Sequence, residues 1–131
     1  MKDSFSIVFI KDKIYSMIEL TSKQRKVLEK FAQPLSALIQ IGGAGLTEEQ
    51  VKHINTLIAS HELIKIKYNI LKSLAGSESK EEISQSRHEL DSEIEAKTNS
   101  THVRTIGNVA IFYRPAKEAK DRKYEKALSK A

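Results

Sequence analysis

The chain has 131 residues, of which 40% are hydrophobic and 30% are charged, and its formal net charge is +5 at pH 7. This length fits one domain of ordinary size, which can fold without a metal ion or a disulfide. Cysteine is absent, which excludes disulfides, thiolate nucleophiles, iron–sulfur clusters and cysteine-ligated zinc sites. No apolar run approaches the roughly 18 residues of a membrane-spanning helix. We therefore expect a soluble basic domain in a reducing, cytoplasmic compartment.

The charges are unevenly distributed along the chain. Residues 78–97 contain seven acidic and three basic side chains, whereas residues 114–131 contain seven basic and three acidic ones. One acidic element in a basic remainder can present a directional field to a polyanion. Charge alone leaves two interpretations open, which are nucleic-acid binding and a solvated lysine-rich surface without a partner.

The first apolar run of the chain, SIVFI, is too short for a signal peptide. It is either part of an extension without a fold of its own or an edge strand in which Phe5, Ile7 and Phe9 alternate. The first helix is predicted over residues 22–32, capped by Thr21. One face of this helix carries Gln24, Val27, Leu28 and Phe31, and a basic stripe beside it carries Lys23, Lys26 and Lys30.

A short strand over residues 38–41 is predicted to end in the glycine loop GGAG, residues 42–45. Thr47 and Gln50 then form a capping box that begins the second helix, which runs to about Ser60. A strand that leads through glycines into a capped helix brings free backbone N–H groups together, and phosphate can bind there. The same motif also fits a plain tight turn, and it lacks the residues of a P-loop or a dinucleotide fingerprint.

The remaining pattern predicts a strand, an acidic helix and a hairpin, and the hairpin turn is Gly107-Asn108. The resulting order, α-β-α-β-α-β-β, predicts an α/β fold with one mixed four-stranded sheet packed with helices. We expect a left-handed cap at Asn99, which follows the acidic helix. These elements are predicted over residues 62–70, 80–97, 101–106 and 109–114.

Several side chains have more than one possible role. Phe112 is predicted to lie in the core, the role of Tyr113 is left open, and Tyr68 is a candidate for stacking on bases. His61 is expected to cap a helix end or to pack structurally rather than to contact RNA. The acidic side chains of residues 80–97 are expected to form a solvated face that points away from RNA.

Four stretches of the chain, in the same order, resemble the CRM domain, a family known for chloroplast RNA splicing and ribosome maturation. The chain is most similar to the single-domain bacterial YhbY-like branch of that family, over residues 17–118. The resemblance implies a fold similar to the C-terminal domain of translation initiation factor three. The four stretches are LTSKQRKVLEKFAQPL (20–35), IQIGGAGLTEEQ (39–50), SHELIKIK (60–67) and VRTIGNVAIFYRP (103–115).

The resemblance also implies which residues bind RNA. The glycine loop would grip the nucleic-acid backbone as the GXXG loop of KH domains does. The family's first helix and the end of its last strand would add cations, and we include Lys30 because it extends the basic stripe. The predicted RNA-binding residues are Gly42, Gly43, Ala44, Gly45, Lys23, Arg25, Lys26, Lys30, Arg114 and Lys117.

The implied function is non-enzymatic binding of ribosomal RNA during assembly of the large ribosomal subunit. The expected partner is a precursor of that subunit, with a monomeric protein and without a cofactor, a metal, a membrane or a small-molecule substrate. One alternative is a protein-interaction module that docks on ribosomal proteins or other assembly factors. Another alternative is an enzyme that uses Glu48 or Glu49 as a base beside the glycine loop, but the sequence lacks a recognisable catalytic arrangement.

The resemblance also suggests a domain organisation. The family-like sequence begins close to Thr21, so Met17 is a candidate start and the preceding segment is expected to be dispensable. The basic tail after Pro115 is either helical or mobile. The expected division is an N-terminal extension, a CRM-like RNA-binding domain and a basic tail, over residues 1–16, 17–115 and 116–131.

Overall fold

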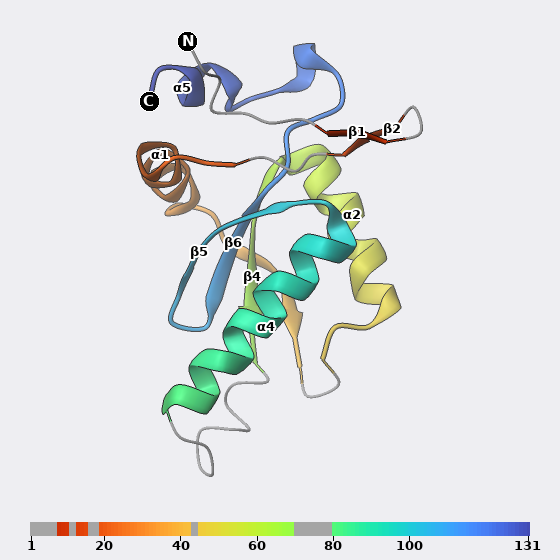
Figure 1. The fold of residues 1–131 in the computed structure, drawn as a ribbon, viewed down its shortest axis with the longest axis vertical. Helices are drawn as coiled ribbons and strands as arrows, with labels where there is room; N and C mark the ends of the chain where they lie inside the picture. The colour runs from red at the N-terminus through yellow and green to blue at the C-terminus, as the bar shows by residue number, and fades with distance from the viewer. Residues whose placement is uncertain (1–7, 11–12, 16–18, 43–44, 70–79) are drawn as a thin grey trace.

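The computed structural model describes residues 8–10, 13–15, 19–42, 45–69 and 80–131 (Figure 1). A two-stranded sheet comes first, and an α/β unit and a short helical tail follow it. No helix in these residues is long and apolar enough to cross a membrane. The elements are β1 (Val8–Ile10), β2 (Lys13–Tyr15), α1 (Ser22–Ala32), β3 (Ala37–Ile41), α2 (Glu48–His61), β4 (Leu63–Tyr68), α4 (Lys80–Thr98), β5 (Thr101–Ile106), β6 (Val109–Tyr113), the 3₁₀ helix η1 (Ala119–Asp121) and α5 (Glu125–Ser129).

The main sheet has four strands in the order β3-β4-β6-β5. β3 runs parallel to β4, whereas β6 runs antiparallel to both of its neighbours. The parallel pair of β3 and β4 follows from the helical connection through α2, and the antiparallel pair of β5 and β6 follows from the tight turn between them. The predicted α/β fold with a mixed four-stranded sheet is confirmed.

Capping side chains fix the start of the first two helices. Thr21 Oγ1 accepts from Gln24 N at 3.1 Å, and the Gln24 side chain accepts from Thr21 N at 2.9 Å. Thr47 and Gln50 form the second capping box, as predicted. Directly after α4, Asn99 has a φ of +51°, which confirms the predicted left-handed position.

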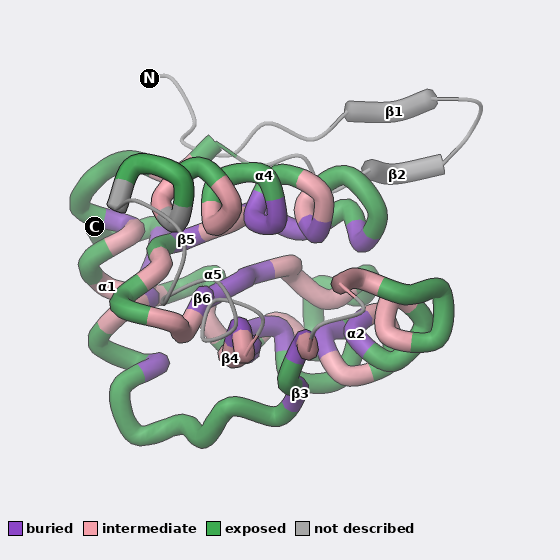
Figure 2. The backbone as a smooth tube through the Cα atoms, turned by 90° about the horizontal axis from the view of Figure 1, so that it is seen from below, coloured by how far each residue is buried: buried purple, intermediate pink, exposed green. Residues whose placement is uncertain are grey.

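The sheet has a hydrophobic core on each side. The first cluster contains Ile64, Ile66 and Phe112 of the sheet, packed against α2 and α4. The second contains Leu63 and Ile111 of the sheet, packed against α1 and α5. Figure 2 shows the buried segments of α4 on its sheet-facing side. The predicted core role of Phe112 is confirmed, and Tyr113 is buried as well.

Two side chains differ from the sequence-based expectation. Tyr68 has no exposed surface, so it cannot stack on a base, because α4 covers this face of β4. Phe31 shares the predicted apolar face of the first helix with Leu28, but it is 42% exposed whereas Leu28 is buried. The Phe31 ring packs beside the Tyr124 ring of the tail, with centroids 5.2 Å apart, and not into the core.

The N-terminal segment and the C-terminal tail also contain regular secondary structure. β1 and β2 pair antiparallel with each other, with Phe9 opposite Ile14, and form a sheet separate from the main one. The described strands of this segment therefore add no edge strand to the main sheet, and Phe5 and Ile7 lie outside the described residues. In the tail, α5 buries Leu128 completely against α1. Of the two alternatives for the tail, the structure shows a short packed helix.

Candidate nucleic-acid interface

The two sides of the main sheet differ in charge. The acidic helix α4 packs on one side, with Leu90 and Ile94 in the first core cluster. Lys65 and Lys67 alternate with Ile64 and Ile66 along β4, so they lie on the other side, which α1 partly covers. The acidic helix and the strand lysines therefore lie on opposite sides of the sheet.

The glycine loop follows the edge strand β3. Gly45 N donates to Gly42 O at 3.0 Å, and Gly45 has a φ of +75°, a conformation that favours glycine. A Cβ atom added at Gly42 or Gly45 would meet no heavy atom within 4 Å. The loop is thus open to close approach of a ligand at both of its described ends, while the predicted residues Gly43 and Ala44 lie outside the described residues.

The lysines of the basic stripe on α1 are exposed, but they do not lie beside the glycine loop. α1 packs over Leu63, near the start of β4, and Lys65 Nζ donates to the backbone oxygens of Gln33 and Leu35 just after the helix. The glycine loop follows the opposite end of β4, where Asn69 N donates to Ile41 O. The structure therefore places the loop and α1 at opposite ends of the sheet (Figure 1). The exposed lysines are Lys23, Lys26 and Lys30.

An open sheet surface lies between the glycine loop and α1. The strand register places Gln40, Lys67, Val109 and Ile106 in one row across all four strands. Each of these side chains is exposed or half-buried, and Ile106 is 56% exposed. Lys67 is not among the predicted RNA-binding residues, although the alternation of LIKIKY indicates that it lies on the face of β4 opposite Ile64 and Ile66. We call this row the open sheet row.

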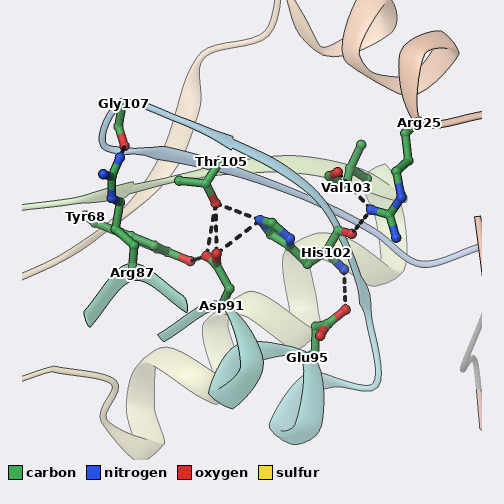
Figure 3. Close-up of polar contacts among 9 residues, drawn as sticks. All are labelled: Arg25, Tyr68, Arg87, Asp91, Glu95, His102, Val103, Thr105 and Gly107. Carbon is green, nitrogen blue, oxygen red and sulfur yellow. Dashed lines mark hydrogen bonds and ion pairs between the residues drawn. The ribbon is translucent and has the colours of Figure 1, made fainter. Parts of the chain in front are cut away.

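Arg25 is engaged with the protein itself. Its Nη1 donates to His102 O at 2.5 Å and to Val103 O at 2.8 Å, on the edge strand β5 (Figure 3). Glu95 accepts from His102 N at 2.7 Å on the same strand, and Arg87 donates to Gly107 O at 2.9 Å. Arg25 therefore holds the β5 edge, and at least one of its donors is not available to a ligand.

A polar network connects α4 to the sheet beneath it. The Asp91 carboxylate, which is 5% exposed, accepts from Tyr68 Oη at 2.6 Å and from Thr105 Oγ1 at 3.0 Å (Figure 3). His102 Nε2 lies 3.3 Å from the same carboxylate. Burial and the Asp91 charge raise the pKa of Tyr68, while burial lowers the pKa of His102 despite the opposing effect of Asp91. The expectation that the acids of this helix are all solvated is wrong for Asp91, because the sheet supplies polar partners for it.

Arg114 follows β6 directly, and its side chain joins the middle of α2 to the end of α4. Its Nη1 donates to Asn55 Oδ1 at 2.9 Å and to Thr98 O at 2.6 Å. These acceptors are neutral, and burial lowers the pKa of the guanidinium. Lys117 is exposed and lines the same pocket as Arg114.

His61, for which the sequence predicts a structural role, is exposed at the end of α2.

Chemistry based on a metal ion finds no support in the described part of the chain, where no group of three or more His, Asp or Glu side chains could hold an ion. The described candidates for binding are instead cations and glycines, spread over the α1 side of the sheet, the glycine loop and the end of β6. Such groups contact phosphate oxygens and position a nucleic acid without reading its sequence.

The chain is similar in sequence to two bacterial proteins that are named as RNA-binding. The chain is 33% identical over 104 residues to an RNA-binding protein of Haemophilus influenzae, which covers 79% of this chain and 94% of that protein. It is 29% identical over 101 residues to the probable RNA-binding protein YqeI of Bacillus subtilis, with 77% and 94% covered.

A solved structure agrees with the fold. The solution structure of a hypothetical protein from Staphylococcus aureus, described as a candidate RNA-binding protein, matches with a TM-score of 0.60 and 28% sequence identity. The match covers 79% of this chain and 97% of that protein. The model of the CRS1/YhbY (CRM) domain matches residues 20–114, from the residue before the first cap to Arg114. The chain therefore belongs to the CRS1/YhbY (CRM) domain family.

Proposed function

We propose that the protein is a non-enzymatic, cytoplasmic RNA-binding protein that contacts the backbone of ribosomal RNA during assembly of the large ribosomal subunit. The observation that carries the proposal is the charge separation across the sheet. The acidic helix α4 lies on one side, and Lys65, Lys67 and the exposed lysines of α1 lie on the other. A polyanion is attracted to the second side and repelled from the first.

The glycine loop supplies a second kind of contact. Thr47 caps α2 directly after the loop, so backbone N–H groups and the positive end of the helix dipole are close to Gly45. A sugar–phosphate backbone can approach Gly42 and Gly45 closely, because no side chain stands there. In this proposal the loop grips phosphates, and the lysines of the α1 side steer and hold the RNA.

Membership of the family supports the choice of RNA as the partner. Two relatives carry RNA binding in their names, and the resemblance to the YhbY-like branch points to ribosome maturation. Contacts to phosphates carry no sequence information, so selection among RNAs would depend on shape or on unpaired bases. A monomer satisfies the proposal, because one chain holds both the loop and the lysines.

Salt dependence tests the binding mechanism. Each phosphate that a lysine neutralises releases counterions, so the affinity for ribosomal RNA fragments should fall by orders of magnitude between about 50 and 200 mM salt if several contacts form. Affinity that does not change with salt would contradict a backbone-binding mechanism.

Sedimentation in a ribosome gradient tests the partner. We expect comigration with free large-subunit particles, and exclusive sedimentation at the top of the gradient would exclude this partner.

Exposed apolar side chains favour a second candidate function, docking on a ribosomal protein or another assembly factor. Leu38 is 45% and Ile106 is 56% exposed on the sheet face that α1 leaves open. A pull-down with and without nuclease separates the two functions. Partners that are lost after nuclease treatment were bridged by RNA, whereas partners that remain contact the protein directly.

A further inference from the structure

A second basic site lies far from the glycine loop, where the chain leaves β6. A pocket of about 590 Å³ opens there between the end of α2, Asn99 and the first part of the tail. Pockets of this size class, roughly 300–1,000 Å³, hold small ligands in proteins. Four cationic side chains and two carboxylates line the pocket: Arg114, Lys117, Arg122, Lys123, Glu118 and Asp121.

A buried carboxylate holds the tail segment that forms the wall of this pocket. Glu62 has no exposed surface, and its two carboxylate oxygens accept from Ala116 N at 2.6 Å and from Lys123 N at 2.5 Å. Arg122 adds hydrogen bonds to the backbone oxygens of Ala116 and Lys117. The segment from Ala116 to Lys123 is therefore fixed at both ends, and the pocket is a formed feature of the fold.

The cations of the pocket are only partly neutralised. Among the described residues, Arg114, Lys117 and Lys123 form no ion pair, while Arg122 pairs with Glu125 at 3.0 Å. Arg114 donates only to neutral acceptors, and Lys123 Nζ donates to Ser60 O at 3.3 Å. A half-buried guanidinium without a carboxylate partner, next to two lysines, favours an anion, and the donors of arginine match the geometry of phosphate.

We infer that this pocket binds a phosphate group of the RNA backbone and forms a second RNA contact at the opposite end of the sheet from the glycine loop. The inference rests on the proposed function. Arg114 and Lys117 are already among the predicted RNA-binding residues, and the pocket adds Arg122 and Lys123, which follow residue 114, where the match to the family model ends.

Two matched double variants test the inference. Lys117→Gln with Lys123→Gln removes two lysines of the pocket, and Lys126→Gln with Lys130→Gln removes two exposed lysines of the same tail that do not line it. The affinity for a mixed-sequence single-stranded RNA is measured against salt concentration. Each lost phosphate contact reduces the magnitude of the slope of log K against log salt by about 0.7, so the variant that loses the phosphate of the pocket should show a slope smaller by about 0.7. The control variant should keep the wild-type slope.

The outcomes separate the two proposals. Equal slopes for the two variants would overturn the pocket while leaving the glycine loop and the α1 side in place. Absence of RNA binding by the wild type would overturn both. If the double variant unfolds at a lower temperature, the single variant Lys117→Gln replaces it in the test, because the Lys117 side chain is exposed. The magnitude of its slope of log K against log salt should fall by about 0.7.

Discussion

The carboxylate of Glu62 accepts a hydrogen bond from Lys123 N at 2.5 Å, across 61 residues of the chain. Glu62 has a φ of +64°, a left-handed conformation that is uncommon for a residue with a Cβ, and it is completely buried. Arg114 N also donates to its backbone oxygen, at 2.8 Å. One residue at the end of α2 therefore fixes both the exit of β6 and the start of the tail.

The first prediction concerns this residue. Glu62→Gln replaces one accepting oxygen by an NH₂ group, which cannot accept from a backbone N–H. We expect a loss of about 1.5–3 kcal/mol in the free energy of unfolding, as for a hydrogen bond to a charged group, measured by urea denaturation. Glu118→Gln, an exposed change of the same kind, should stay within about 0.5 kcal/mol of the wild type. Equal stability of the two variants would show that the buried carboxylate does not hold the tail.

The second prediction concerns the glycine loop. Gly42→Asp places a carboxylate in open space where a phosphate is proposed to bind, without a contact that would strain the fold. Like charges in contact cost several kcal/mol, so RNA affinity should fall by about tenfold or more with little change in melting temperature. Ser92→Asp adds the same charge on the exposed surface of α4 and should leave affinity nearly unchanged. If the two variants bind RNA alike, the loop is only a turn.

The third prediction tests the open sheet row. Lys67→Gln keeps most of the aliphatic stem and removes the charge from the α1 side of the sheet. With single-stranded RNA, the magnitude of the slope of log K against log salt concentration should fall by about 0.7. Lys97→Gln removes one charge from α4 and should not change the slope, although it breaks the pair with Glu93. A normal slope for Lys67→Gln would exclude a phosphate contact at this row.

The fourth prediction is a pH dependence. Burial and the hydrogen bond to Asp91 raise the pKa of Tyr68, so the folded state keeps its proton when the unfolded state loses it near pH 10. A raised folded pKa stabilises the fold below the unfolded pKa, and this stability is lost as pH rises above it. Above pH 10, the wild type should therefore lose about 1.4 kcal/mol more per pH unit than Tyr68→Phe, in denaturation series at increasing pH. Parallel curves would contradict this assignment.

The fifth prediction concerns the N-terminal segment. β1 and β2 pair with each other and do not join the main sheet, so a chain that begins at Met17 should keep the melting temperature and RNA affinity of the full chain. Burying each large apolar side chain contributes roughly 1.5–3 kcal/mol, so a segment that packs into the core would cost several kcal/mol when removed. A large drop in melting temperature would place residues 1–16 within the domain.

Local signals in the sequence were sufficient to predict the helices and strands from α1 to β6. The Thr47–Gln50 capping box, the Gly107 turn and the alternation of β4 each depend on residues only a few positions apart. The order of these elements then predicted a mixed four-stranded sheet, because connections through helices favour parallel strands, whereas the strand order itself came from the structure.

The side-chain partners could not be predicted, because they depend on contacts between distant segments. Arg25 meets His102 and Val103 across 77 and 78 residues, so a residue that looked like a free cation became part of a strand edge. Glu62 follows a helix and gave no signal of burial. Leu128 lies in a five-residue helix, which is too short for a periodic pattern, and only its packing against α1 shows that it belongs to the core.

The hydrogen bonds on β5 have a consequence for self-association. Exposed edge strands normally present free N–H and C=O groups on which another chain can build a further strand. On β5, His102 O and Val103 O accept from Arg25 and His102 N donates to Glu95, and on the other edge strand Gln50 Nε2 donates to Gln40 O at 2.9 Å. A strand from a second molecule would have to displace these side chains before it could pair. The protein can therefore leave a sheet face open to a ligand while its own side chains block part of each edge against growth into aggregates.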